Sequence, residues 1–548
     1  MTIFIFLSFY LFLYFFTRGF FTVINLINTK REKNKIELEE SNIFYPLFAL
    51  FFIGNLVFVL NFIFSLNYVF IFLLILIITI SFFNLKNLKK LSLSFTSIFQ
   101  HVFLPLILSV STFGTNLHAD AGGYHLNSQL WIKEYPIVFG LSNLDPTYGY
   151  LSIFEYVSSF FWIQGNFIFL HFINLIFVVL FFNFLFSNLI VKKSNFLFFT
   201  SLFIFLFGII DNFGYSGGKN GFIVLQSAGK FDNSFSILFI ITNLLIFNAI
   251  KNKEYSSNNF NKLIFLSFFT FQIKLFGVYL FVPLVYFILS SKEPLMTYLK
   301  SIKVYIGLFS FWTLKSLITN SCLIYPVAPT CIKNLKWYTD GYVEGVVSIV
   351  RNFHFSYSFN QSIITWFNEW RYLAENNTTI LNFFFSYFFL FLVSKIFFKT
   401  DSLVKEPIFT IFIFSYILLL FLAWLTTSPE IRFGIGIFVL SVSLLTIFID
   451  DYRFSFLKFF ENKSSFILLT FLCAFLIVRL SSYKEFLDNP FLIYEIKTPV
   501  VEYIDSKDSW NKISKVKVTE CWANIDCVPN NSVTKKSKIY QRYLLFTK

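Results

Sequence analysis

The sequence predicts an all-α protein that crosses a membrane many times. More than half of the 548 residues, 56%, are hydrophobic and only 14% are charged, and a soluble protein of this size could not bury so much apolar surface. Apolar runs of membrane-spanning length also recur along the chain, with short basic loops between them. Counting these runs gives about 14 membrane segments, within a range of about 11–14.

The basic loops predict how the chain is oriented. When all of them are placed in the cytoplasm, the remaining long loops and the tail after Leu480 lie on the extracytoplasmic face. This alternation also accounts for the net charge of +14, so no nucleic-acid partner is expected. The basic loops comprise residues 30–35, 86–90, 192–193, 251–262, 292–303, 395–405 and 453–463.

One apolar run, from Leu263 to Ser291, is too long for a single span and has basic loops on both sides. A hairpin of two short helices, with Lys274 near its outer tip, satisfies these charges. Because a lysine in the hydrocarbon core would cost about 3 kcal/mol, Lys274 is expected to face a cavity or a phosphate.

The chain divides into a transmembrane bundle, residues 1–480, and a polar extracytoplasmic segment, residues 481–548, which is expected to form a small cap. The first extracytoplasmic loop, residues 113–165, carries the candidate site. Within this loop we expect a short helix over 122–133 and an amphipathic stretch over 148–162. The amphipathic stretch is expected to lie along the membrane surface, as a roof over the bundle.

Four of the five cysteines form two close pairs in extracytoplasmic segments: Cys322 with Cys331, and Cys521 with Cys527. Disulfides that close such short loops contribute about 2–3 kcal/mol each in an oxidising compartment. A metal site is the alternative, but the spacings are not C-x-x-C and no histidine accompanies them. Disulfides are therefore favoured.

A polar island, from Asp120 to His125, interrupts the apolar pattern at the start of the first loop. A carboxylate followed by two glycines, a tyrosine and a histidine indicates that a polar substrate is handled at the bilayer surface. Asp120 is the leading candidate for a catalytic carboxylate, with Tyr124 and His125 as candidates beside it. The alternatives are that Asp120 caps the following helix and that His125 is a satisfied loop histidine, instead of a substrate or metal ligand.

Charged residues in other extracytoplasmic segments complete the candidate set. Lys219, in a glycine-rich loop, and Lys230 suit a phosphate, although either lysine can be merely solvated. Asp232 begins an apolar run, where a capping role is the alternative to a functional one. Glu430 and Arg432 lie at the mouth of the bundle. A guanidinium binds phosphate in bidentate fashion, and the alternative for Arg432 is contact with lipid headgroups.

Signature motifs of nucleotide-dependent and soluble enzymes are missing from the sequence. There is no GxxxxGK[ST], GxSxG or HExxH motif and no dinucleotide-binding fingerprint. Any reaction is therefore expected to use a substrate that has been activated elsewhere.

Several segments together resemble an uncharacterised bacterial family of multi-spanning membrane proteins. The resemblance rests on HADAGGYHLNSQLWIKEY at 118–135, GLSNL at 140–144, SLITNSCLIYP at 316–326, SPEIRFG at 428–434, and Cys521-Trp522 with Cys527.

That family is similar in layout to the GT-C glycosyltransferases, which take sugars from polyprenyl-phosphate donors. The similarity implies a bundle of about 11 to 14 spans with an acidic residue and two surface helices in the first outer loop. It implies that Asp120 acts as a base toward an acceptor hydroxyl and that Lys274 and Arg432 hold the donor phosphate. Better-known members often carry two adjacent acidic residues, whereas Ala121 follows Asp120 here. The metal is therefore left unknown, and a divalent cation is the one cofactor considered.

The expected function is that of a glycosyltransferase in a bacterial inner (plasma) membrane, with its active face extracytoplasmic. Its partners are then the lipid bilayer, a polyprenyl-phosphate-linked sugar, and a glycan or lipid acceptor of the cell envelope. The alternative is an O-antigen-type polymerase or ligase, which depends mainly on outer arginines and histidines. A transporter or flippase ranks last, because the charges gather at the outer face instead of at mid-membrane.

Overall fold

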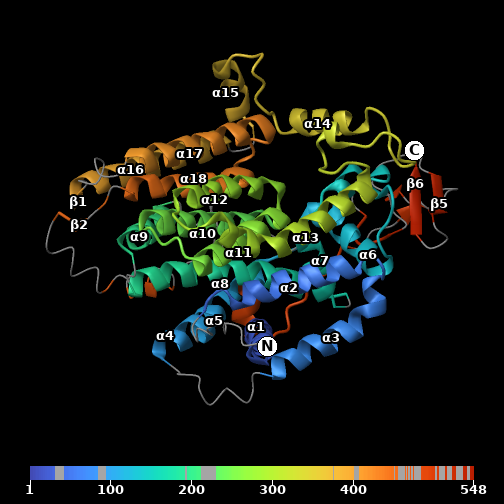
Figure 1. Ribbon diagram of the computed structural model, residues 1–548, viewed down its shortest axis with the longest axis horizontal. Helices are drawn as coiled ribbons and strands as arrows, with labels where there is room; N and C mark the ends of the chain where they lie inside the picture. Colours follow the sequence, from blue (N-terminus) through green and yellow to red (C-terminus); the bar gives the residue numbers. More distant parts are fainter. Residues whose placement is uncertain are drawn as a thin grey trace.

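The computed structural model is a bundle of helices, most of which run roughly side by side (Figure 1). It describes residues 1–30, 42–83, 94–163, 165–191, 194–210, 230–373, 376–399, 407–447, 449, 451–453, 463, 466, 469–470, 473, 483–499, 503–504, 513–514, 521–525, 535–539 and 543–547.

The α-helices in this part of the chain are α1 (Thr2–Lys30), α2 (Tyr45–Leu60), α3 (Leu66–Phe82), α4 (Phe95–Ile98), α5 (Leu104–Ser109), α6 (Leu126–Glu134), α7 (Ile153–Phe161), α8 (Ile168–Val191), α9 (Asn195–Ile210), α10 (Asp232–Lys251), α11 (Ser257–Ile273), α12 (Phe281–Ser290), α13 (Leu295–Asn320), α14 (Tyr342–Phe353), α15 (Ile363–Arg371), α16 (Asn376–Phe397), α17 (Pro407–Thr427), α18 (Ile431–Thr446) and α20 (Lys484–Asp488). Short 3-10 or π-helical turns are η2 (Phe99–Phe103), η3 (Val110–Gly114), η4 (Ala121–His125), η5 (Leu141–Asn143), η6 (Pro146–Gly149), η8 (Leu275–Leu280) and η9 (Ala328–Thr330). The strands pair antiparallel as β1 (Phe398–Lys399) with β2 (Asp451–Tyr452), β3 (Tyr503–Ile504) with β4 (Ile513–Ser514), and β5 (Lys535–Ile539) with β6 (Tyr543–Thr547).

The prediction of an α-helical membrane protein is confirmed in its general form. Six of the described helices are long and apolar enough to cross a membrane, and five shorter apolar helices accompany them. These helices are fewer than the segments counted in the sequence. Residues 454–482, where the sequence predicts a further span, lie almost entirely outside the described residues.

Loops that the sequence predicts to share one face meet at one end of the bundle. The first loop packs there on the end of α2, where the Asn61 side chain donates a hydrogen bond to the Tyr135 carbonyl at 3.0 Å. It also meets the end of α13, since the Gly140 N–H donates to the Ile318 carbonyl at 2.9 Å. Helices α10 and α18 begin at this end too, because cations at or next to their first residues contact Asp120.

The segments next to the basic loops meet at the opposite end. The Lys251 ammonium, at the end of α10, donates to the Ile447 carbonyl just after α18, at 3.0 Å. Strand β1, which follows α16, pairs there with β2 at the left of Figure 1, far from β5 and β6 at the right. The polar first loop and these described segments therefore lie at different ends of the bundle.

Lys274 breaks the long apolar run between α11 and η8. Its backbone is extended, with φ −149° and ψ 135°. Gly277 then packs directly on the preceding helix, where a Cβ at this position would lie 2.5 Å from the Phe271 nitrogen. The chain therefore folds back at Lys274, as the hairpin prediction requires.

Helix α7, in the stretch expected at the membrane surface, is buried along its whole length. It packs among α2, α6 and α8. Its polar residues are satisfied inside the protein, because Glu155 contacts His125 and Gln129 while the Ser159 hydroxyl donates to the Glu155 carbonyl. The prediction of a surface helix at this position is wrong, since the polar face meets buried polar groups and not water.

Exposed amphipathic helices occur instead in the loop after α13. Helices α14 and α15 lie at the edge of the bundle, at the top of Figure 1, and Trp370 of α15 packs on Trp424 of α17. Each carries exposed apolar side chains, among them Ile349, Phe353 and Ile364.

The described parts of the C-terminal segment run along the first loop and the start of α1. The Tyr494 N–H donates to the Thr2 hydroxyl at 2.7 Å. Strand β6 lies beside Phe139, whose N–H donates to the Leu544 carbonyl at 3.0 Å. The first loop is therefore covered on one side by residues from the end of the chain.

Close packing of α2 on α7 depends on Gly54. A Cβ at this position would lie 2.7 Å from a methyl carbon of Val157. We expect Gly54→Leu to destabilise the protein by about 1–3 kcal/mol through overpacking. The measurement is thermal unfolding in detergent. Gly307→Leu is the matched control, because nothing lies within 4 Å of a Cβ at Gly307 on α13. Equal unfolding temperatures for the two variants would contradict the packing described.

Candidate active site

Asp120 lies at the start of the π-helical turn η4, which leads into α6. Its side chain makes no capping hydrogen bond, so the structure gives no support to the interpretation of Asp120 as a cap. Its backbone N–H donates to Nδ1 of His118 at 3.0 Å. Because this ring nitrogen accepts the N–H, it does not donate to the Asp120 carboxylate, although it lies 3.5 Å from Oδ2.

Two cations contact the Asp120 carboxylate. Its Oδ2 lies 3.4 Å from Lys230 Nζ and 3.3 Å from Arg432 Nη1. The Lys230 side chain is 9% exposed, whereas those of Asp120 and Arg432 are each 30% exposed, so the carboxylate and the guanidinium are partly accessible. We call these three residues, together with the adjoining Asp232, Lys274 and Glu430, the ionic cluster. Three segments far apart in the sequence therefore bring their charged groups together.

A second ion pair adjoins the first. Lys274 Nζ lies 2.9 Å from Asp232 Oδ1, at the first turn of α10. The same ammonium lies 3.5 Å from the ring centroid of Phe433, and the Arg432 guanidinium lies 4.7 Å from that centroid. Contacts of this kind stabilise a cation by about 0.5–2 kcal/mol. Phe433 thus links Lys274 with Arg432, and with them the two ion pairs.

Glu430 orients Arg432. One oxygen of the Glu430 carboxylate accepts a hydrogen bond from Arg432 Nε, and the other contacts Nδ1 of His354. His354 follows α14, so the loop after α13 also reaches the site. The Trp424 indole N–H donates to the Glu430 carbonyl at 2.9 Å and fixes the backbone from which Arg432 projects.

Lys230 is held in place through its backbone. Its carbonyl accepts a hydrogen bond from the Asn174 side chain of α8 at 2.7 Å, and the Ser234 hydroxyl donates to the other end of the same amide at 2.8 Å. These bonds tie the entrance of α10 to α8. The position of the ammonium beside Asp120 therefore depends on the packing of two buried helices.

The neighbouring cations control the ionisation of Asp120. Burial alone would raise the pKa of this carboxyl, but the charges of Lys230 and Arg432 hold the pKa below its usual value. Asp120 is therefore ionised at neutral pH and serves as the counter-ion of two cations.

Similar causes shift the pKa values of two other titratable groups beside Asp120 and Arg432. Burial lowers the pKa of His118, and nearby Lys230 lowers this pKa further, so the ring is neutral at neutral pH. Burial would raise the pKa of Glu430, but the hydrogen bond with His354 and the charge of Arg432 bring the pKa below its usual value. Both carboxylates that contact Arg432 are thus charged.

His125 and Tyr124 lie on the buried side of the turn η4. His125 is 3% exposed, and its Nδ1 contacts the Glu155 carboxylate, whose other oxygen accepts from Gln129 at 2.8 Å. The Tyr124 and His125 rings are 4.1 Å apart. Burial raises the pKa of Tyr124 well above its usual value, so its hydroxyl stays protonated. This arrangement joins η4 to α7 and suits a positioning role for both residues.

The remaining predicted residues lie elsewhere. Cys322 and Cys331 are joined by a disulfide with an S–S distance of 1.99 Å, and Cys521 is also disulfide-bonded. Lys219 and Cys527 lie outside the described residues. Within the described part of the chain, no group of three or more His, Cys, Asp or Glu side chains is arranged to hold a metal ion.

Sequence reasoning did not select His118, His354 or Glu155 as site residues. A signal for the histidines was present, because the chain contains only five, and His118, His125 and His354 all contact carboxylates in or beside the ionic cluster. Glu155 gave no such signal, since a carboxylate in an amphipathic helix is ordinarily solvated.

The lowered pKa values of Asp120 and Glu430 predict loss of stability in acid. A carboxyl whose pKa is lower in the folded state stabilises the protein above its unfolded pKa of about 4, and this contribution is lost as the pH falls through the folded value. We expect the unfolding temperature in detergent to fall below pH 4, and less steeply in Asp120→Asn than in wild type. Asp488→Asn, at an exposed carboxylate, should follow the wild-type curve. Parallel curves for all three proteins would contradict the ionic contacts of Asp120.

The chain matches a known family model. Residues 1–440 match the model of a domain of unknown function, DUF8201, and this range holds every residue of the ionic cluster. None of the curated proteins and none of the solved structures compared with the chain matches it. Since the matched range covers most of the 548 residues, the chain belongs to the DUF8201 family.

Proposed function

We propose that this protein is a GT-C-type glycosyltransferase of the bacterial inner membrane. It moves a sugar from a polyprenyl-phosphate donor to a glycan or lipid acceptor of the cell envelope, on the extracytoplasmic face. About 14 spans, as counted in the sequence, belong to this proposal. The observation that carries it is the contact of the Asp120 carboxylate with Lys230 and Arg432 at one end of an apolar bundle.

Each group in the cluster has a task in such a transfer. The acceptor hydroxyl attacks the anomeric carbon of the donor sugar, and its proton passes to Asp120 as general base. The bond between that carbon and the phosphate oxygen breaks, and the electron pair leaves with the polyprenyl phosphate. Arg432, Lys230 and Lys274 stabilise the phosphate charge, and the planar guanidinium can bind two of its oxygens. No nucleotide is needed, because the donor arrives activated.

The charge balance of the cluster suggests how donor and base are coupled. Among the described residues, three carboxylates (Asp120, Asp232, Glu430) face three cations (Lys230, Lys274, Arg432). A donor phosphate must therefore take cations away from carboxylates. Once Lys230 and Arg432 turn to the phosphate, the pKa of Asp120 rises toward its usual value and its oxygens become available. Donor binding thus frees the Asp120 carboxylate to accept a proton.

The competing functions fit the charged residues less well. A polymerase or ligase would draw on several outer arginines and histidines. Three histidines do lie in or beside the cluster, but Arg351 is exposed on α14 and the Arg371 guanidinium donates to Tyr372. A transporter would place its charges at mid-membrane, whereas Asp232 and Arg432 stand at the first turns of their helices. The glycosyltransferase accounts for more of the cluster.

Asp120→Asn is expected to remove transfer while the fold persists. Loss of a general base lowers the rate by about 10²–10⁴-fold, and Asn keeps the shape of the side chain. The measurement is the envelope glycan and lipid profile of a deletion strain complemented with each variant, with the protein amount in the membrane determined in parallel. Asp488→Asn is the control and should restore the wild-type profile. A wild-type profile from Asp120→Asn would refute the role of this carboxylate.

Arg432→Gln is expected to weaken polyprenyl-phosphate binding. A hydrogen bond to a charged group contributes about 1.5–3 kcal/mol, so the affinity of the purified protein in nanodiscs should fall by about tenfold or more. Native mass spectrometry with polyprenyl phosphate of defined length measures this affinity. Arg351→Gln is the matched control, since Arg351 lies exposed on α14. Equal loss in both variants would favour a nonspecific effect of surface charge over a phosphate site.

A further inference from the structure

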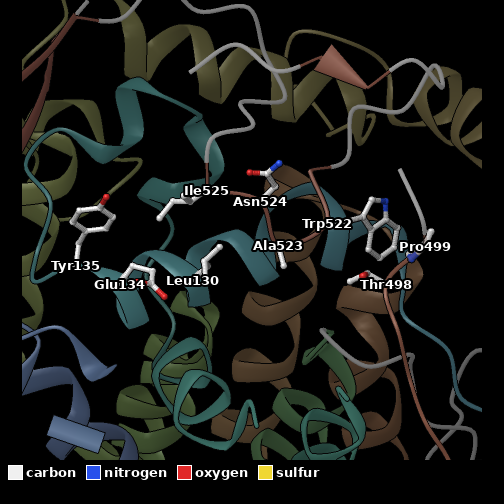
Figure 2. A pocket seen from close by; sticks show the side chains of 9 residues that line it. All are labelled: Leu130, Glu134, Tyr135, Thr498, Pro499, Trp522, Ala523, Asn524 and Ile525. Atoms are coloured by element: carbon white, nitrogen blue, oxygen red, sulfur yellow. The ribbon is translucent and has the colours of Figure 1, made fainter. Parts of the chain in front are cut away.

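A cavity of about 580 Å³ lies between α6 and residues from the end of the chain (Figure 2). Its volume falls within the range of about 300–1,000 Å³ that is typical of small-ligand sites. Leu130, Glu134 and Tyr135 line it from the side of the first loop. Figure 2 shows the C-terminal residues around the rest of the cavity: Thr498, Pro499, Trp522, Ala523, Asn524 and Ile525.

The lining indicates a ligand rich in hydroxyl groups. Glu134, Asn524 and Thr498 supply a carboxylate, an amide and a hydroxyl, while Trp522 and Tyr135 supply aromatic rings. Aromatic faces pack against the C–H faces of sugar rings, and carboxylate and amide groups bind sugar hydroxyls. Glu134 already accepts one hydrogen bond from the Asn67 side chain at 2.8 Å, which orients its carboxylate.

The same lining disfavours a phosphate. Among the described residues that line the cavity there is no Lys or Arg, and the Glu134 carboxylate would repel an anion. The cations instead surround Asp120, in the ionic cluster. The two sites therefore differ in the chemistry they can accept.

Trp522 connects the cavity with the turn that carries Asp120. The N–H groups of Cys521 and Trp522 both donate to the Gly122 carbonyl, at 2.8 and 3.1 Å. The indole packs on Gly122 so closely that a Cβ there would lie 2.4 Å from a ring carbon. Gly122 is two residues from Asp120, so one side chain contacts both the cavity and the reactive turn.

The backbone at this connection is held in an unusual conformation. Trp522 and Ala523 have φ angles of 42° and 63°, in the left-handed region that side-chain-bearing residues rarely adopt. Such conformations persist where surrounding structure imposes them, and they cluster at ligand sites. Here the hydrogen bonds from the Cys521 and Trp522 N–H groups to the Gly122 carbonyl hold this part of the backbone in place.

We propose that this cavity is the acceptor subsite and that it takes the saccharide part of a glycan or glycolipid acceptor. The inference rests on the proposed function and adds where the second substrate binds. Trp522 stacks on a sugar ring, and Glu134 and Asn524 bind its hydroxyls. A hydroxyl of this acceptor then reaches Asp120 past Gly122, while the cations of the ionic cluster bind the phosphate of the lipid-linked donor.

The test measures saccharide binding without any need for transfer. Purified protein in nanodiscs is titrated with a set of methyl glycosides of common envelope sugars, and binding is followed by ligand-observed saturation-transfer NMR. We expect at least one glycoside to bind to wild type, and its affinity to fall by tenfold or more in Trp522→Ala and in Glu134→Gln. Phe491→Ala and Asp488→Asn are the matched controls, at exposed positions outside the cavity, and should bind like wild type.

Glu134→Gln keeps the test decisive if Trp522→Ala fails to fold, because Glu134 is exposed at the end of α6. Absence of binding by every glycoside, or equal binding by wild type and the cavity variants, overturns the proposal. Polyprenyl-phosphate binding is measured in the same samples. If saccharide binding depends on Glu134 but phosphate binding does not depend on Arg432, the pocket stands as a saccharide site and the glycosyltransferase proposal fails.

Discussion

The contact of the Asp120 carboxylate with Lys230 and Arg432 fixes how the ends of the helices are arranged. Charges at the edge of an apolar bundle are costly unless they are paired, so each partner restricts where the others can lie. Arg432 comes from the start of α18 and Lys230 from the residues before α10, while Asp120 follows α5 in the first loop. A single carboxylate thus ties together elements more than 300 residues apart, since Arg432 follows Asp120 by 312 positions.

Much of this site could be predicted from the sequence, because charged residues are scarce in so apolar a chain. Asp120, Lys230 and Arg432 stand out against their apolar surroundings, and the structure brings them into contact. The break at Lys274 was predictable for the same reason, since a lysine cannot lie unpaired in an apolar run. The composition gave the fold class directly.

What the sequence did not reveal was the pairing. The sequence does not predict the contact between His354 and Glu430, because the two residues belong to different loops and His354 is flanked by phenylalanines. The error at α7 has a related cause. An amphipathic pattern shows that one face of a helix is polar, but it does not distinguish water from a buried partner such as His125. The number of membrane segments depends on short apolar helices, whose length alone does not settle whether they cross a bilayer.

The internal neutralisation of the ionic cluster has a consequence for encounter rates. Opposite charges a few ångströms apart largely cancel at longer range, and the Debye length of about 8 Å at physiological ionic strength screens what is left. A free anion in aqueous solution would therefore experience little electrostatic steering toward Arg432. Capture would instead favour a molecule that diffuses within the plane of the membrane and reaches the site at the depth of the helix ends. A long hydrocarbon tail would both anchor such a ligand in the membrane and deliver it to this depth.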